Sequence, residues 1–457
     1  MSSTGLDAAI DKMRAEGLGD AAVESFARQY RRLREGETGT LAETEIDPVA
    51  TLPDADDLTE QADAALLDQA VVIKLNGGLG TSMGMTKAKS LLEVKDGKSF
   101  LDLIAEQVLD LRERSRARLP LILMNSFATR EDSLAALERY DDLAAGLPAD
   151  FVQNKVPKVR EDDLTPVEWG ADPALEWAPP GHGDLYTALV TSGMLEALLG
   201  EGYRYAFVSN SDNLGAVLDP RILAWLAGAG APFLMEVADR TSSDRKGGHL
   251  ARRKGDGGLV LREIAQTPEE DVDAFQDTSR HRYFNTNTLW VDLHALRDVL
   301  AAGDGVIDLP MIVNRKTVDP ADKSSTPVIQ LETAMGAAIG VFAGAAALRV
   351  PRSRFVPVKT TNDLLSLRSD AYVIGEGRAV HLAPERGGVP PFVDLDPDSY
   401  KLVADFDARF PSGAPSLVAC DTLRVVGDVR FGADVVIRGD VTVKGVESVP
   451  DGAVLDG

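Results

Sequence analysis

The chain has 457 residues, of which 44% are hydrophobic and 26% charged, a composition typical of globular proteins that excludes a disordered or fibrous chain. Its formal net charge of −24 repels polyanions, so neither a nucleic-acid polymer nor an anionic membrane is an expected partner. The single cysteine, Cys420, cannot form an intramolecular disulfide, which fits a cytoplasmic location.

Residues 1–69 carry many acidic side chains and place apolar residues at helical spacing, for example Ile10, Met13, Phe26 and Tyr30. This pattern predicts an acidic, helical N-terminal segment that covers part of the main domain.

From residue 70 the pattern changes to short apolar runs, each followed by a turn and a helical stretch. The runs lie at 71–75, 121–124, 205–208, 233–237 and 288–291. They predict an α/β domain with a mostly parallel sheet over residues 70–365, with ligands at the carboxyl ends of the strands. A Gly/Ala-rich run at 334–348 is too short to span a membrane and predicts a buried helix.

The last part of the chain, within a predicted C-terminal domain at 366–457, has a six-residue period. One aliphatic or aromatic row consists of Val425, Phe431, Ile437, Val443, Val449 and Leu455. A hexapeptide period is typical of a left-handed β-helix, and a short antiparallel meander is the alternative.

A glycine-rich turn, 76–84, follows the first apolar run, and Lys87 and Lys89 follow the turn. Glycines let backbone N–H groups approach an anion, a helix N-terminus after the turn adds its dipole, and a lysine supplies charge. The turn is a candidate phosphate-binding loop, although many such loops are only tight turns. Its spacing fits neither the dinucleotide fingerprint nor the Walker loop.

Two further segments carry candidate functional side chains. His182 lies between glycines in a Pro-Pro-Gly-His-Gly-Asp turn. It is either a base or a polar loop residue without a chemical role. Asp212 follows a strand directly and suits Mg²⁺ bound together with substrate phosphates, unless Asp212 or Asn213 simply caps the next helix.

Cations and amides also gather in later turns. Asn287 suits sugar hydroxyls, and Lys359, at the end of the segment 351–359, suits phosphate. Cations in turns of a strongly acidic chain favour a focused site for an anion.

Taken together, these segments resemble the UTP-glucose-1-phosphate uridylyltransferase family, the eukaryotic-type UDP-glucose pyrophosphorylases. The resemblance runs in order through 74–84, 151–155, 179–184, 209–214, 284–287, 330–334 and the segment ending at Lys359, and includes the hexapeptide tail. It implies a Rossmann-like nucleotidyltransferase domain. One departure is Lys87-Ala88, where the family usually has Gly-Pro before the lysine that matches Lys89.

The resemblance implies a role for each site residue. UTP phosphates would bind at Leu75, Asn76, Gly77, Gly78 and Lys89, and the uracil at Gln153 and Gly181. The sugar phosphate would bind at His182, Asn210, Ser211 and Asn287; Asp212 would hold Mg²⁺, and Lys359 would be the catalytic lysine.

The implied reaction joins UTP and glucose 1-phosphate to give UDP-glucose and pyrophosphate, by in-line attack of the sugar phosphate on the UTP α-phosphorus. A related enzyme for N-acetylhexosamine 1-phosphate is the runner-up. A non-enzymatic nucleotide-sugar sensor would be expected to have lost Lys89, Asp212 or Lys359, and all three are present. The resemblance also favours self-association through the C-terminal β-helix.

Overall fold

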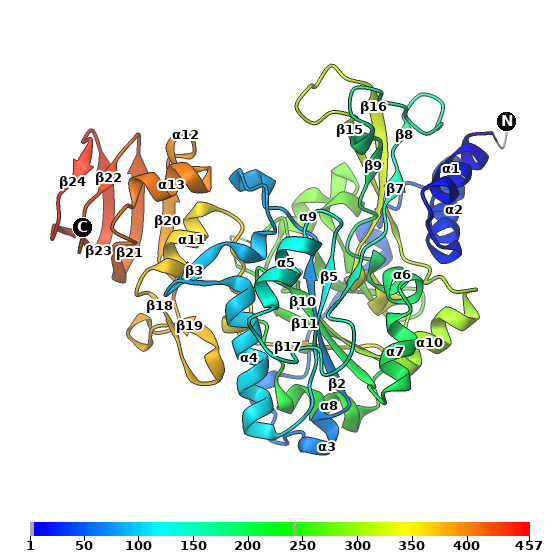
Figure 1. The fold of residues 1–457 in the computed structure, drawn as a ribbon, viewed down its shortest axis with the longest axis horizontal. Helices are drawn as coiled ribbons and strands as arrows, with labels where there is room; N and C mark the ends of the chain where they lie inside the picture. The colour runs from blue at the N-terminus through cyan, green and yellow to red at the C-terminus, as the bar shows by residue number, and fades with distance from the viewer. Residues whose placement is uncertain (1–3, 242–243) are drawn as a thin grey trace.

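The computed structural model describes residues 4–241 and 244–457 (Figure 1). A central sheet lies between helices, the N-terminal helices pack at one side, and the C-terminal strands form the opposite end. The helices are α1 Thr4–Ala15, α2 Asp20–Arg34, α3 Ala64–Leu67, α4 Phe100–Ser115, α5 Arg130–Leu137, α6 Asp184–Thr191, α7 Met194–Gly200, α8 Pro220–Ala229, α9 Val272–Gln276, α10 Leu293–Ala302, α11 Thr361–Arg368, α12 Pro397–Tyr400 and α13 Val403–Arg409.

The central sheet contains ten strands of the described chain. They are β1 Ile46–Pro48, β2 Ala70–Asn76, β5 Leu121–Asn125, β6 Asp150–Val152, β10 Tyr205–Asn210, β11 Phe233–Asp239, β12 His249–Arg253, β13 Leu259–Arg262, β14 Tyr283–Asp292 and β17 Ala346–Arg349. Parallel pairing joins β10, β2, β5 and β6 in that order, and joins β11 to β17. The predicted mixed α/β fold with a mostly parallel sheet is confirmed, and β14 runs antiparallel between β10 and β11.

Both faces of the sheet are buried, which explains the near-continuous apolar runs in its strands. On β2, Val72 packs into the hydrophobic core that contains α4. Val71 and Ile73 point to the other face, into the core formed with α6, α7 and α10. The start of α4 is fixed by a capping box, because Ser99 Oγ accepts the Asp102 N–H and Asp102 Oδ2 accepts the Ser99 N–H.

The N-terminal helices pack on a small sheet at the edge of the molecule. That sheet pairs β8 Val159–Arg160, β16 Pro327–Thr333 and β15 Met311–Thr317, and β7 Val156–Pro157 pairs with β9 Trp177–Ala178 beside it. Met13, Phe26 and Tyr30 are buried against Val156 and Ile329. No helix in the described part of the chain is long and apolar enough to cross a membrane.

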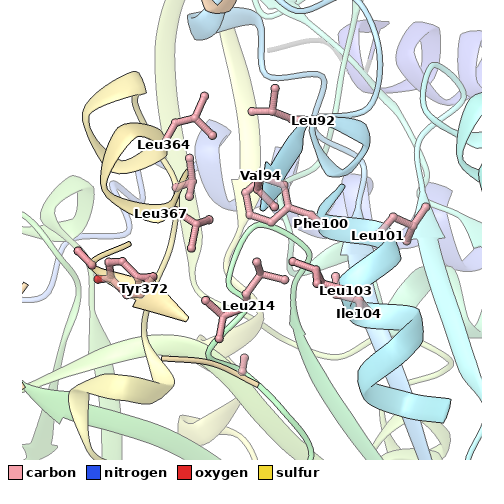
Figure 2. Packing of buried hydrophobic residues seen from close by; sticks show 14 of the residues in the cluster. Leu92, Val94, Phe100, Leu101, Leu103, Ile104, Leu214, Leu364, Leu367 and Tyr372 are labelled. Carbon is pink, nitrogen blue, oxygen red and sulfur yellow. The ribbon is translucent and has the colours of Figure 1, made fainter. Parts of the chain in front are cut away.

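One hydrophobic core fastens three segments that are far apart in sequence (Figure 2). Phe100 and Ile104 of α4, Leu214 and, from α11, Leu364 and Leu367 meet in it. Two short hairpins flank this region, β3 Glu93–Lys95 with β4 Lys98–Ser99 and β18 Tyr372–Ile374 with β19 Val380–Leu382. The segments that follow Asp212 and Lys359 are therefore held against each other by packing.

The Gly/Ala-rich run at 334–348 is not the predicted helix. It forms a 3₁₀ turn, η9 (Met335–Gly340), and then β17. Gly336 approaches Asn285 so closely that a Cβ there would lie 2.8 Å from Asn285 Nδ2. Small residues serve this close approach rather than helix packing.

The C-terminal segment forms parallel strands, β20 Phe392–Leu395, β21 Ser416–Val426, β23 Val436–Lys444 and β25 Val454–Asp456, with β22 Arg430–Phe431 beside β24 Ser448–Val449. Leu423 lies opposite Val441 and Phe431 opposite Val449, so strand partners are three hexapeptides apart. Parallel pairing excludes the antiparallel meander. It does not define the hand of the coil, so the left-handed β-helix stays a prediction. The domain boundaries at 69/70 and 365/366 also stay predictions.

Candidate active site

The predicted site residues line one edge of the central sheet. The parallel register puts Asn210 beside Leu75 and Asn76 beside Asn125, and Gln153 follows the end of β6. The antiparallel register of β14 puts Leu289 beside Val208. Asn287, two residues before Leu289, therefore comes to the same edge as Asn210, two residues after Val208. From Gln153 to Asn287 the edge crosses five strands, roughly 19 Å at the usual strand spacing.

The glycine-rich loop leaves this edge after Asn76. Gly80 and Gly84 have φ values of 66° and 75°, which favour glycine, and the Lys89 N–H donates to Gly78 O at 3.0 Å to close the loop. Two short 3₁₀ turns, η3 (Thr81–Met83) and η4 (Lys89–Leu91), follow the loop. The expected helix N-terminus behind the loop is therefore wrong, and backbone N–H groups and Lys89 are left as its anion-binding groups.

Lys89 and Asp212 come together although they are far apart in sequence. Lys89 Nζ donates to Asp212 Oδ2 at 2.6 Å, and both side chains keep a partly exposed surface. Neither Asp212 nor Asn213 caps a helix, because the next helix, α8, is capped by Asp219. This excludes the capping alternative for Asp212.

Two of the predicted site residues, Asn76 and Ser211, hold the strand ends in place with their side chains. Asn76 Nδ2 is buried and donates to Asn125 Oδ1 and Ser133 Oγ, both at 2.8 Å. Ser211 Oγ donates to Leu75 O at 2.8 Å. The Asn76 side chain thus supports the loop from below rather than facing it.

Gln153 lies against the glycine loop. A Cβ on Gly77 would lie 2.7 Å from Gln153 Oε1, so only glycine fits there without displacing that amide. Ser126 Oγ donates to Gly77 O at 3.0 Å and fixes the same peptide. Gln153 and the loop therefore form one continuous surface.

The turn that carries His182 is held by β16. Gly181 has φ 78°, and a Cβ there would lie 2.4 Å from Thr333 O. His182 Nδ1 accepts the Met335 N–H at 3.0 Å, which assigns the ring proton to Nε2. Desolvation lowers the pKa of His182 to about 4, although the residue as a whole is exposed. The Met335 hydrogen bond favours the same neutral form, so His182 can donate a hydrogen bond but is not a cation at neutral pH.

The Asn287 backbone has φ 56°, a left-handed conformation that asparagine tolerates. Asn285 Nδ2 donates to Asn287 Oδ1, and Asn285 Oδ1 accepts the Asn287 N–H, both at 2.9 Å. Asn285 thus stabilises the turned-out backbone at the point where β14 meets the edge.

Lys359 is joined to the Asp212 turn through the backbone. The Val358 N–H donates to Asp212 O at 3.2 Å, and Asn213 bonds to Arg354 O and to the Val356 N–H. The Lys359 side chain is exposed, with Nζ 6.0 Å from the Phe355 ring centre.

A buried ionic network supports this segment from beneath. Arg354 makes a bidentate pair with the fully buried Glu236, at 2.7 Å for both bonds. Lys74 Nζ donates to Ser209 Oγ and Ala216 O below the same strands. Burial lowers the pKa of Lys74 to about 7, Arg354 acts in the same direction and Glu236 opposes it.

Glu263 is a candidate that the sequence prediction missed. Burial raises the pKa of Glu263, and the positive charge of Lys359 acts in the opposite direction. A Cβ on Gly248 would lie 2.5 Å from the Glu263 carboxyl group. A single acidic residue after a strand does not stand out in a sequence. The glycine pair Gly247-Gly248, of which Gly248 packs against Glu263, was the sequence feature that could have pointed to it.

A mostly parallel sheet that carries a glycine loop, a lysine–aspartate pair and a second lysine near its carboxyl edge is the arrangement expected of an α/β protein that binds nucleotide phosphates. A profile of the UTP–glucose-1-phosphate uridylyltransferase family matches residues 23–438. The enzyme of that name from Hordeum vulgare is 43% identical over 90% of this chain and 85% of its own. The Saccharomyces cerevisiae enzyme is 41% identical over 85% of this chain and 77% of its own.

Solved structures similar to this chain come from enzymes of the same kind as these relatives. A mutant of the UDP-glucose pyrophosphorylase from Leishmania major, in complex with UDP-glucose, matches with TM-score 0.94 and 46% identity over 100% of this chain and 99% of its own. A Trypanosoma brucei structure matches with TM-score 0.91 and 47% identity over 99% and 98%. The chain belongs to the UTP–glucose-1-phosphate uridylyltransferase family, a family of nucleotidyltransferases, and the resemblance in its motifs is confirmed.

Proposed function

We propose that this protein converts UTP and glucose 1-phosphate reversibly to UDP-glucose and pyrophosphate with Mg²⁺. The observation that carries the proposal is the order of groups along the sheet edge, from Gln153 through the glycine loop and Lys89–Asp212 to Asn287. A nucleotide sugar has its parts in that order, with a base, then phosphates, then a sugar.

Each residue then has one task. Gln153 and Gly181 bind the uracil, and Leu75, Gly78 and Lys89 the UTP phosphates, with the Asn76 and Gly77 peptides in the same loop. The sugar phosphate binds among His182, Asn210, Ser211 and Asn287. His182 suits this as a neutral donor, because its Nδ1 already accepts the Met335 N–H.

Mg²⁺ fits this site through substrate ligands. No group of three His, Cys, Asp or Glu side chains among residues 4–241 and 244–457 could hold a metal by itself. Asp212 would supply one carboxylate, and phosphate oxygens and water would provide the other ligands. When bound, the ion supplies positive charge beside the departing pyrophosphate.

The chain's own groups do the rest by positioning and charge. An oxygen of the sugar phosphate attacks the α-phosphorus of UTP in line. Because this nucleophile is already an anion, no general base is needed. Lys89 stabilises the leaving pyrophosphate, and Lys359 stabilises charge on the α-phosphate and the attacking phosphate.

Pyrophosphate release from UTP across a panel of sugar 1-phosphates tests the reaction. We expect release with glucose 1-phosphate and Mg²⁺, and loss of release when Mg²⁺ is chelated. No release with glucose 1-phosphate, but strong release with N-acetylglucosamine 1-phosphate, would move the assignment to the hexosamine enzyme. UTP binding without turnover of any sugar phosphate would indicate a sensor.

We also propose that the protein self-associates through its C-terminal strands. Phe392 on β20 and Val454 on β25 are 53% and 48% exposed, and these strands are the two edges of the C-terminal sheet. Exposed apolar edge strands favour pairing with another copy. Changing Val454→Lys should therefore lower the mass measured by light scattering to that of one chain, with turnover kept. A wild-type protein that is already a single chain, or an unchanged assembly in the variant, contradicts this interface.

A further inference from the structure

A buried carboxylate joins the two turns that carry Gln153 and His182. Asp184, the first residue of α6, accepts the Asn154 N–H at 2.6 Å and Asn154 Nδ2 at 2.9 Å. Asp184 and Asn154 are only 5% and 8% exposed, so water does not compete for these bonds. One carboxylate thus holds both the backbone and the side chain of the residue that follows Gln153.

The same aspartate ends the turn on the other side of the site. The Asp184 N–H donates to Gly181 O at 3.2 Å, and Thr191 Oγ1, at the end of α6, donates to Asn154 Oδ1 at 3.3 Å. Movement of either turn would break these bonds. The carboxylate also lies in the first turn of α6, where a helix favours negative charge.

We propose that Asp184 is a positioning residue for base recognition, which holds Gln153 through Asn154 and Gly181 through its own backbone N–H. This inference rests on the proposed function, because it takes these two residues as the ones that contact the base. Asp184 lies behind the turns and is not itself a catalytic residue. Burial raises its pKa to about 7 while both Asn154 bonds oppose the rise, so the ionised form depends on them.

Exchanging the two side chains between positions 154 and 184 separates the effect of their hydrogen bonds from the effect of their volume. Asp184→Asn places an NH₂ group against one of the two Asn154 donors, and Asn154→Asp brings two carboxylates together. In the double variant the amide oxygen at position 184 can again accept the backbone N–H of position 154. The amide NH₂ group at position 184 can then donate to the new carboxylate at position 154.

The test is UTP and CTP binding by calorimetry, together with kcat and KM for UTP. We expect Asp184→Asn to raise the Kd and KM for UTP about 10-fold and to reduce the preference for UTP over CTP, with a smaller change in kcat. The double variant should recover to within about threefold of wild type. Asn154→Ala, which keeps the backbone bond, gives a milder loss and serves if Asp184→Asn does not fold.

A matched control is Asp292→Asn. Asp292 is a similarly buried carboxylate that accepts two backbone N–H groups at the start of α10 and a bond from Arg204. It lies opposite Tyr205, at the other sheet edge from the one that Asn287 joins. It should lower the melting temperature without changing UTP preference. Unchanged UTP preference in Asp184→Asn and Asn154→Ala, or no recovery in the double variant, overturns the inference alone. A wild type that neither binds UTP nor releases pyrophosphate overturns the proposed function and the inference with it.

Discussion

Replacing Lys359 with alanine is expected to lower kcat on the order of 10²-fold, about 3 kcal/mol, with a smaller change in KM for either substrate. The reason is that, in the proposed mechanism, this lysine acts where charge develops in the transition state. Its backbone neighbours bond to Asp212 and Asn213, while its side chain is exposed. Steady-state kinetics and a thermal melt measure the effect, and the melting temperature should barely move.

Lys323→Ala is the matched control for Lys359→Ala, because it removes an exposed lysine from a turn outside the site. It should leave kcat and both KM values unchanged. If Lys359→Ala keeps its kcat and only the KM for UTP rises, Lys359 binds substrate and transition state equally, and its catalytic role is wrong.

Replacing Asp212 with asparagine is expected to lower kcat on the order of 10²-fold or more and to raise the Mg²⁺ concentration needed for half-maximal activity. Asparagine keeps the shape of the side chain but removes the negative charge that pairs with Lys89 and is available to a divalent cation. Initial rates over a Mg²⁺ titration measure both effects.

Asp132→Asn controls for the loss of a carboxylate near the same loop, because Asp132 Oδ1 lies 3.7 Å from Lys87 Nζ at an exposed position. Its Mg²⁺ curve should follow the wild type. An Asp212→Asn enzyme with a normal kcat and a normal Mg²⁺ curve would exclude Asp212 as a metal ligand.

The sequence indicated where the candidate site residues lie, because most of them follow apolar strands directly. Leu75, Asn210 and Gln153 come at or just after strand ends, and ends of parallel strands share one edge. Asn287 is different, since it lies inside β14 and reaches the edge only because that strand is antiparallel. Strand direction depends on how the chain connects through space, which an apolar run does not encode.

The sequence also did not predict which groups the polar side chains of the site contact. Its spacing marked Asn76 as part of a phosphate loop, but the side chain is buried on Asn125 and Ser133. It gave no indication that Lys89 meets Asp212 across 123 positions. It also predicted a helix at 334–348 from composition, where the structure has a 3₁₀ turn and a strand, with Gly336 packed closely against Asn285.

By itself, then, the sequence determined the α/β class, five of the ten strands of the central sheet, the ordered family motifs and the six-residue period of the tail, because burial and backbone preference act over a few neighbouring residues. The tertiary structure alone decided which edge Asn287 joins, how Asp184 ties Asn154 to the His182 turn, and that the tail strands pair in parallel. Those outcomes depend on packing and hydrogen bonds between residues far apart in the chain, and only the folded chain brings these residues into contact.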